Sequence, residues 1–285
     1  MEHFYAIRIK KSLRNENNYM ERKKMIGVFC FSLVIKVPYD TGANQRGSRF
    51  SPSILGKYLN EQSKTIHTNQ NIKHMLQDIY TIHKNDVDKN TPILLGGDHS
   101  VSIGSVFSSN DYCKQQNLTM GVLWCDAHAD FNTYDSSLSK NLHGMPIAVL
   151  CGHTLPKLNI GQTQLLPSQF SYFGVRDIDK QELYRIRKHN MVIHKSVENI
   201  IQWVYNYDRI HLSFDIDCID SNEIRSVNTP CKNGISIETL RDLFTQLKST
   251  NKLVAIDIVE YNPKFDENGA DAEKLGNILS VFKNS

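Results

Sequence analysis

The sequence predicts an α/β fold in which a mostly parallel sheet is covered by helices on both faces. Short apolar segments alternate with segments of helical character from residue 25 to residue 259. Parallel strands need crossover connections, which are usually helices, so this alternation is typical of a parallel sheet. The apolar segments also end repeatedly in Asp, Glu or His. Parallel α/β sheets bind ligands at the carboxyl ends of their strands, so the pattern predicts a site there.

The first elements are predicted from composition and spacing. Residues 25–37 (MIGVFCFSLVIKV) are rich in Val, Ile and Phe, as expected of a buried first strand. Pro52 suits the first turn of a helix, which we expect over 52–59. The apolar residues of 71–85 recur at helical spacing and predict a second helix. A short buried strand over 91–95 then ends in GGDHS, and 101–107 open a helix.

The same alternation continues to the end of the predicted sheet. Short apolar runs bounded by polar residues predict strands, and amphipathic or proline-initiated runs predict helices. The remaining expected strands are 120–125, 171–175, 191–193, 210–214 and 253–259. The remaining expected helices are 144–150, 182–189, 197–205 and 237–247.

The chain is predicted to have one domain, residues 25–285, after an N-terminal extension. Residues 1–24 are polar and basic, and disorder is left open for them. A basic stretch followed by about ten apolar residues also resembles a signal peptide. The apolar run is too short to span a bilayer, and no evident A-x-A cleavage site follows it. A buried first strand is therefore the favoured interpretation.

Composition excludes some function classes. The chain has 285 residues, 40% of them apolar and 22% charged, which is ordinary for a globular protein. A formal charge of +3 and the lack of a long basic run after residue 25 give no indication of nucleic-acid binding. Six scattered cysteines without a CxxC pair do not predict a disulfide framework. We expect reduced cysteines in a cytoplasmic protein, with Cys125 and Cys218 as packing residues beside the candidate site.

The central motif is Asp126-Ala-His-Ala-Asp130, directly after an apolar run. In extended backbone, residues i, i+2 and i+4 project to the same side, so Asp126, His128 and Asp130 point into one space. Carboxylates brought together without compensation repel, and a bound cation removes that cost. A solvated polar loop is the alternative for this motif taken alone.

The same pattern recurs at other strand ends. Asp215 and Asp217 alternate after the strand at 210–214, and His99 follows the strand at 91–95. Asp179 and Glu260 follow two further strands. His99, the central motif and the Asp215/Asp217 pair together offer four Asp and two His, a donor set that favours a hard or borderline divalent ion such as Mn²⁺. Six ligands suffice for two ions that share bridging carboxylates.

With these motifs the chain resembles the arginase/agmatinase (ureohydrolase) family over most of residues 27–285. The matching motifs are GGDHS (96–100), DAHADFN (126–132), NLHGMP (141–146), GVRDID (174–179), SFDIDCID (213–220) and Glu260 followed by YNP. The resemblance implies a three-layer αβα fold and two Mn²⁺ per chain. One ion would be held by His99, Asp126, Asp130 and Asp215. The other would be held by Asp126, His128, Asp215 and Asp217, with Asp126 and Asp215 bridging.

The resemblance also implies how a substrate would bind. The family positions matching Asn132, Ser139 and Asn141 surround the α-carboxylate of arginine in arginases. Asp179 and Glu182 match positions that receive its α-amino group, and Thr229 is a further expected contact. This favours arginase over agmatinase, because agmatine has no α-carboxylate. Ordinary turn chemistry is the alternative explanation of Asn132 and Ser139.

One loop departs from the family pattern. Arginases usually carry Gly before Thr-Pro, whereas this chain has Asn228 before Thr229 and Pro230. Asn tolerates left-handed backbone better than most residues, so we expect the loop to keep its conformation. The departure bears on substrate preference.

The expected reaction is hydrolysis of the guanidino group of L-arginine to L-ornithine and urea. Two metal ions lower the pKa of a shared water, which gives a bridging hydroxide as nucleophile. Glu260 would pair with the guanidinium and orient it. Asp130 would hydrogen-bond the tetrahedral intermediate. His143 would carry a proton to the leaving amine, with a structural helix-start histidine as the alternative.

Two rival functions are kept. One is an agmatinase or another ureohydrolase that acts on a guanidino or formimino compound. The other is a non-catalytic relative that binds an amino acid. The resemblance further implies a homotrimer or homohexamer, while no membrane or nucleic-acid partner is expected.

Overall fold

The computed structural model describes residues 33–59, 62–68 and 71–283. Within them the chain forms an eight-stranded sheet with the strand order β2-β1-β3-β8-β7-β4-β5-β6. Every pair of neighbouring strands is parallel. The strands are β1 (Val34–Val37), β2 (Ser63–Thr65), β3 (Ile93–Gly96), β4 (Met120–Cys125), β5 (Phe170–Phe173), β6 (Val192–His194), β7 (Arg209–Asp215) and β8 (Leu253–Val259).

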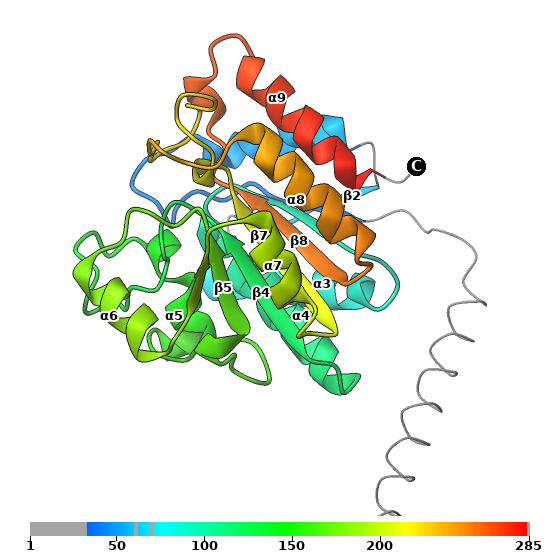
Figure 1. Cartoon of the computed structure of the whole chain (residues 1–285), viewed down its shortest axis with the longest axis vertical. Coiled ribbons are helices and arrows are strands. Elements are labelled where there is room, and N and C mark those ends of the chain that lie inside the picture. The colour runs from blue at the N-terminus through cyan, green and yellow to red at the C-terminus, as the bar shows by residue number, and fades with distance from the viewer. Residues whose placement is uncertain (1–32, 60–61, 69–70, 284–285) are drawn as a thin grey trace, which may run out of the picture. The chain divides into compact units, whose positions relative to one another are not determined.

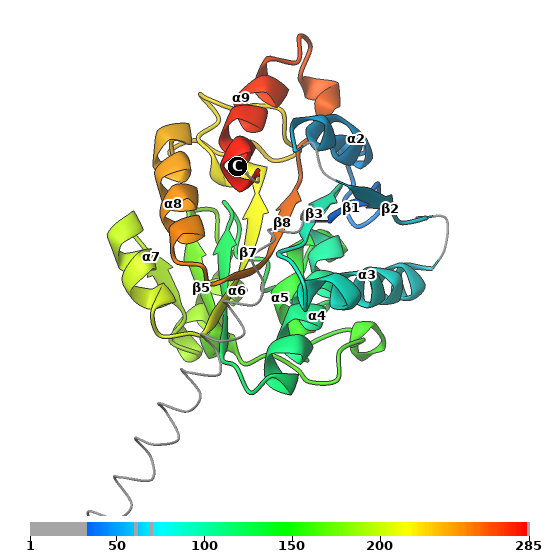
Figure 2. The same ribbon diagram turned by 90° about the vertical axis from the view of Figure 1, so that its right-hand side faces the viewer.

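Helices cover both faces of the sheet, which confirms the three-layer α/β prediction (Figures 1 and 2). One face carries α3 (Ile72–Val87), α4 (Ser102–Gln115), α5 (Pro146–Leu150) and α6 (Lys180–Lys188). The other face carries α2 (Ser51–Leu55), α7 (Val197–Val204), α8 (Ile237–Ser249) and α9 (Ala270–Leu279).

Two apolar cores result from the alternation of side chains along each strand. On β4, Val122 and Trp124 pack with α4 and α5, while Leu123 and Cys125 pack on the opposite side with α7 and α8. All four side chains are fully buried. Full burial of a large apolar side chain contributes about 1.5–3 kcal/mol, so the central strands are fixed from both sides. A continuous apolar sequence is the consequence, because neither face of the strand meets water.

The predicted elements are found within a few residues of their expected positions. The expected first strand over 25–37 begins at Val34 in the described part, and residues 25–32 lie outside the described residues. The extension over 1–24 lies outside them as well. Two elements were not predicted, β2 and α9. β2 has three exposed residues and no apolar pattern, whereas α9 follows Gly269, whose left-handed φ of 71° starts the helix from a turn.

The strand order positions the functional loops. β3, β8, β7, β4 and β5 are consecutive neighbours, so their carboxyl ends lie next to one another. The motifs that follow these five strands come from residues 97 to 260 and meet at one edge. This is the edge at which open parallel α/β sheets bind ligands.

Candidate active site

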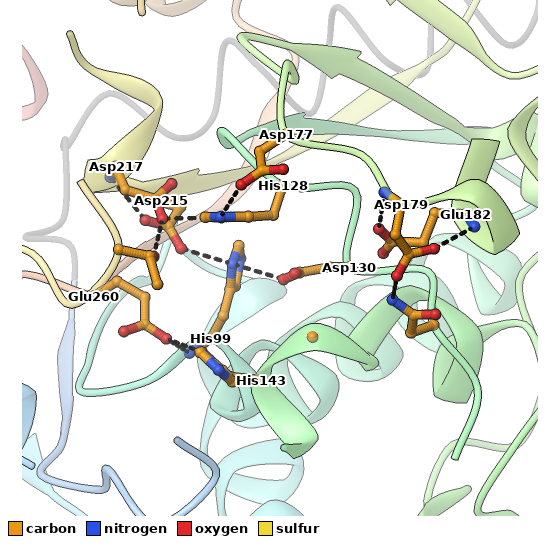
Figure 3. Close-up of a pocket in the computed structure, with 13 residues that line it drawn as sticks. His99, His128, Asp130, His143, Asp177, Asp179, Glu182, Asp215, Asp217 and Glu260 are labelled. Atoms are coloured by element: carbon orange, nitrogen blue, oxygen red, sulfur yellow. Dashed lines mark hydrogen bonds and ion pairs between the residues drawn. The ribbon is translucent and has the colours of Figure 1, made fainter. Parts of the chain in front are cut away.

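A cavity of about 230 Å³ opens at the carboxyl ends of the central strands (Figure 3). Most of the side chains that line it can carry charge. The lining residues are His99, His128, Asp130, Asn132, His143, Gly144, Asp177, Asp179, Glu182, Asp215, Asp217, Thr229 and Glu260.

A tight turn after β3 positions His99. A Cβ on Gly97 would lie 1.9 Å from the carbonyl oxygen of Tyr39, so only glycine fits at this close approach. Asp98 accepts hydrogen bonds from the backbone nitrogens of Gly42 (2.7 Å) and Ser100 (3.0 Å). These bonds satisfy a buried carboxylate and fix the short 3₁₀ turn that starts at His99.

The ring of His99 lies among three carboxylates. Its Nδ1 is 3.1 Å from one oxygen each of Asp126, Asp130 and Asp215. This nitrogen is buried and makes no hydrogen bond of acceptable geometry. On the other side of the ring, Nε2 lies 2.8 Å from the hydroxyl of Ser213. A buried nitrogen without a partner is costly, and its place among carboxylate oxygens is what a metal ligand requires.

Trp124 fixes the geometry of this cluster from the core side. Its indole stacks on His99 with ring centroids 4.1 Å apart and an interplanar angle of 8°. The indole nitrogen donates a 2.9 Å hydrogen bond to Asp126. One fully buried side chain therefore orients both an imidazole and a carboxylate.

His128 belongs to a second, adjoining cluster. Its Nδ1 is 3.1 Å from Asp217 and 3.5 Å from Asp126. Donor atoms of Asp126, His128 and Asp217 lie within 4.8 Å of one another, as do those of His99, Asp126 and Asp130. Asp126 is common to both groups, so the two clusters adjoin through one carboxylate.

Electrostatics show that the cluster needs positive charge. Burial and the neighbouring Asp126 raise the pKa of Asp130 to about 7. Burial, Asp217 and Asp126 raise the pKa of Asp215 well above its usual range. Burial also disfavours ionisation of Asp126, but His128 and His99 outweigh it and lower the pKa of this carboxyl. Burial beside other carboxylates thus disfavours the ionised forms of Asp130 and Asp215, which a bound cation would favour. The oxygen-rich donor set fits a hard or borderline divalent metal.

Glu260 and His143 form a pair on another wall of the cavity. Glu260 Oε1 lies 3.0 Å from His143 Nδ1 and accepts a 3.0 Å hydrogen bond from the backbone nitrogen of His99. Burial lowers the pKa of His143, but the hydrogen bond and charge of Glu260 outweigh it and raise this pKa to about 9. Glu260 and Asp130 both have left-handed backbone, with φ of 68° and 51°. Such strained positions are typical of functional sites.

An acidic pair stands at a third wall, at the start of α6. Asp179 caps the helix by accepting from the backbone nitrogens of Gln181 and Glu182. Its other oxygen accepts a 2.7 Å hydrogen bond from Asn132. Glu182 accepts from the backbone nitrogen of Phe131 at 3.0 Å, and burial with the nearby Asp130 raises its pKa to about 7. The two carboxylates therefore stand at the cavity with fixed geometry.

Comparisons with known proteins show the family of the chain. The sequence profile of the Arginase family matches residues 32–279. An arginase of Entamoeba histolytica is 37% identical over 214 residues, which cover 71% of this chain and 72% of that protein. An arginase of Staphylococcus aureus is 32% identical, covering 67% of each.

The chain belongs to the arginase family. It is accordingly an enzyme of the arginase type, a hydrolase of C–N bonds other than peptide bonds. A crystal structure of Entamoeba histolytica arginase in complex with L-ornithine superposes with a TM-score of 0.79 at 29% identity, covering 88% of this chain and 96% of that one.

Most of the residues predicted for an arginase-family site lie at the cavity. Of the six expected metal ligands, five line it, and Asp126 is buried next to them, 3.1 Å from His99 and 3.5 Å from His128. The expected catalytic residues Asp130, His143 and Glu260 line it as well. Among the expected substrate contacts, Ser139 and Asn141 do not line the cavity. They lie on the adjoining loop, where the Ser139 hydroxyl accepts from the backbone nitrogen of Asn141 at 3.2 Å.

The expectation that Asn228 has a left-handed backbone was wrong. Asn228 is not among the described residues with positive φ. Its side chain instead donates to Glu260 at 3.3 Å and accepts from Asn262 at 2.7 Å. Asparagine in place of the family glycine therefore adds a side-chain hydrogen bond to Glu260 in the cavity wall, and the backbone at Asn228 is not strained.

Sequence reasoning missed three residues at the site. Asp177 and Gly144 line the cavity, and Cys231 lies beside His128. Asp177 also follows β5 in the sequence, but only Asp179 was predicted to be a site residue of this segment. Cys231 directly follows Pro230 of the loop discussed above, but a single cysteine without a CxxC partner gave no signal of its own.

The five cysteines among the described residues are free, as expected, and Cys30 lies outside them. Cys125 and Cys218 are fully buried packing residues. No helix of the described residues has the length and apolar character needed to cross a membrane.

Proposed function

We propose that this protein is an arginase that holds two Mn²⁺ ions and hydrolyses L-arginine to L-ornithine and urea. The observation that carries the proposal is the buried, unpartnered Nδ1 of His99, 3.1 Å from three carboxylates at the floor of the cavity. The chain is also 37% identical to an arginase of Entamoeba histolytica, and the similar Entamoeba crystal structure is a complex with L-ornithine.

The metal ligands follow from the two clusters. His99, Asp126, Asp130 and Asp215 would hold one ion, and Asp126, His128, Asp215 and Asp217 would hold the other. Asp126 and Asp215 would be shared. Four carboxylates and two imidazoles suit Mn²⁺ better than a metal that prefers thiolates. When bound, two such ions lower the pKa of a shared water and thereby supply a nucleophile near neutral pH.

Glu260 would bind and orient the guanidinium of the substrate. A carboxylate and a guanidinium pair through charge-assisted hydrogen bonds of fixed geometry. The bond from the His99 backbone holds the Glu260 carboxylate at the metal-binding floor of the cavity. The carbon to be attacked would then lie beside that floor, and this positioning lowers the entropic part of the barrier.

His143 would hold the proton that the leaving amine needs. With a pKa raised to about 9 by Glu260, its imidazole is protonated at neutral pH. Departure of ornithine as a free amine requires a proton at the scissile nitrogen, and a positioned acid supplies it. Asp130, which also lines the cavity, would hydrogen-bond the tetrahedral intermediate.

The acidic wall would select an α-amino acid. Asp179 and Glu182 would receive the α-ammonium group, with Asn132 placed beside them by its hydrogen bond to Asp179. Ser139 and Asn141 would contribute to the α-carboxylate end from the adjoining loop. Thr229, whose hydroxyl donates to Asp217 at 2.9 Å, would contact the substrate on the side of the second cluster.

The family resemblance also supports a cytoplasmic homotrimer or homohexamer built from one domain per chain, with residues 1–24 as an extension. Sedimentation velocity of the full chain tests the assembly. A purely monomeric protein at micromolar concentration would contradict it.

The function is tested by urea release from L-arginine after metal removal and reloading. We expect chelated protein to be inactive, manganese-loaded protein to release equimolar urea and ornithine, and metal analysis to give two Mn²⁺ per chain. Manganese-loaded protein that binds both ions but releases no urea from arginine would overturn the arginase proposal. Urea from agmatine alone would favour the agmatinase alternative.

A further inference from the structure

His128 presents its two ring nitrogens to different neighbours. Nδ1 faces Asp217 and Asp126 in the cluster described above. Nε2 lies 3.9 Å from a carboxylate oxygen of Asp177, a pair joined by a dashed line in Figure 3. The thiol of Cys231 lies within 4.8 Å of a ring nitrogen of His128. One imidazole therefore connects the buried cluster with a second group of donors.

The second group has the spacing of a metal site. His128, Asp177 and Cys231 each offer one donor atom, and the three atoms lie within 4.8 Å of one another. Asp177 is exposed and His128 is partly exposed. Cys231 is the partly exposed cysteine among those that the structure describes, since the other four are buried. The donors are thus open to a solvent cation, unlike the core thiols.

The backbone holds these donors in place without a metal. Arg176 donates to the carbonyl oxygens of Cys231 (3.0 Å) and Lys232 (2.9 Å), and also to that of Asp217 (2.9 Å). This guanidinium therefore fastens the Cys231 loop to the end of β7. Asp177 donates its backbone N–H to Ala127 at 3.0 Å, and a bridge pairs it with His128. Preorganised donors bind an ion with little ordering cost.

The donor chemistry differs from that of the inner clusters. A thiolate, an imidazole and a carboxylate suit Zn²⁺ and similar thiophilic ions, whereas Mn²⁺ prefers oxygen. Three protein ligands with one open position are a common arrangement for zinc. A solvent water would complete the tetrahedron.

We propose that His128, Asp177 and Cys231 form a rim site for a thiophilic divalent cation of the Zn²⁺ class, and that an ion bound there inhibits the enzyme. Binding displaces two protons, one from the Cys231 thiol and one from Nε2 of His128. The ion is held by His128 and Asp177, which both line the cavity, and so narrows the path to its floor. The inhibitory consequence rests on the proposed function, but the existence of the site does not.

Cd²⁺ is a suitable probe, because a cadmium–thiolate bond gives an ultraviolet charge-transfer absorption that needs no turnover. We expect manganese-loaded protein to develop this absorption with one Cd²⁺ per chain, while its Mn²⁺ content stays constant. The absorption should disappear in Cys231→Ser and require more Cd²⁺ in Asp177→Asn. Cys151→Ser, which removes the buried thiol of the residue that follows α5, is the matched control and should leave the absorption unchanged.

Zn²⁺ inhibition of urea release then tests the consequence. Loss of one ligand should raise the half-inhibitory Zn²⁺ concentration by about tenfold or more in Cys231→Ser, with activity in the absence of zinc retained. Cd²⁺ absorption that survives in Cys231→Ser, or that appears only as Mn²⁺ is released, would overturn the rim site. Equal zinc sensitivity of Cys231→Ser and the wild type would overturn the inhibitory role. If the protein releases no urea, the absorption still decides whether the site exists.

Discussion

Glu260 Oε1 lies 3.0 Å from Nδ1 of His143 and 3.0 Å from the backbone nitrogen of His99. The same carboxylate oxygen therefore touches the expected proton donor and the turn that carries an expected metal ligand. The proposed binding of the guanidinium and the proposed proton delivery depend on this one side chain. Glu260 directly follows β8 and has a left-handed φ of 68°. The chain therefore turns out of the extended strand conformation at this residue.

Glu260→Gln should lower kcat/KM for L-arginine by about 10²–10³-fold, because a neutral amide neither pairs with a guanidinium nor raises the pKa of His143. Steady-state urea assays on manganese-loaded protein measure this, with metal content measured alongside. Glu267→Gln, at an exposed loop carboxylate, is the control and should be neutral. Wild-type kcat/KM in Glu260→Gln would rule out the role assigned to this residue.

Ser213→Ala should weaken manganese binding by about 10–100-fold, since the serine hydroxyl orients His99 through Nε2 at 2.8 Å. Equilibrium dialysis against buffered Mn²⁺ gives the affinity directly. Ser171→Ala is a matched control, because this serine is equally buried on the neighbouring part of the sheet and its hydroxyl has no partner. Equal affinity in both variants would show that the Ser213 bond does not support the metal site.

Asp179→Asn should raise KM for L-arginine by about tenfold or more while kcat changes little, because uniform binding of the α-ammonium group is lost. Asparagine can still cap α6, so the helix start is kept. The control is Asp135→Asn, an exposed carboxylate on the loop beside the cavity. A fall in kcat with unchanged KM would argue that Asp179 acts on the reacting end instead.

The buried pair His83 and His211 predicts acid sensitivity of the fold. Their rings stack at 6.2 Å, His83 is fully buried, and burial with the nearby His211 lowers the pKa of His83 to about 3. Below pH 6.5 the unfolded chain binds a proton at His83 that the folded chain does not bind until about pH 3. The free energy of unfolding should therefore fall as pH drops through this window, by about 1.4 kcal/mol per pH unit for this proton.

Urea denaturation of the wild type and of His83→Asn measures that slope. The range from about pH 7 to about pH 4 lies mostly between the pKa of His83 in the unfolded chain and that in the folded chain. The variant should be less stable at pH 7 but lose stability less steeply as pH falls. Parallel curves would contradict the assignment of the slope to His83.

Much of the fold could be predicted because burial on both faces leaves a simple pattern. The apolar run of β4 was predicted at its observed bounds, since all six residues are buried. β2 could not be predicted, because its three residues are exposed and show no apolar pattern. They form a strand because they pair with Val34 to Lys36. Pairing of that kind is a tertiary effect with no local signal.

The site was predictable to the extent that its residues follow strands. His99 follows β3 by three residues, Asp126 comes directly after β4, and Asp215 ends β7. The parallel topology brings such ends together. Cys231 lies on a loop that Arg176 fastens to the end of β7 through backbone carbonyls. Contacts between carbonyl oxygens and a side chain leave no pattern in the sequence, so this part of the site needed the structure.

The most direct test of the central claim is the ratio of kcat/KM for L-arginine to that for agmatine, measured on manganese-loaded wild-type protein. The acidic wall of Asp179 and Glu182 and the adjoining loop are proposed to bind an α-amino acid end that agmatine lacks in part. We expect L-arginine to be preferred by at least about 10²-fold, the range that a lost set of polar contacts produces. Preference for agmatine, or equal use of both substrates, would contradict the account.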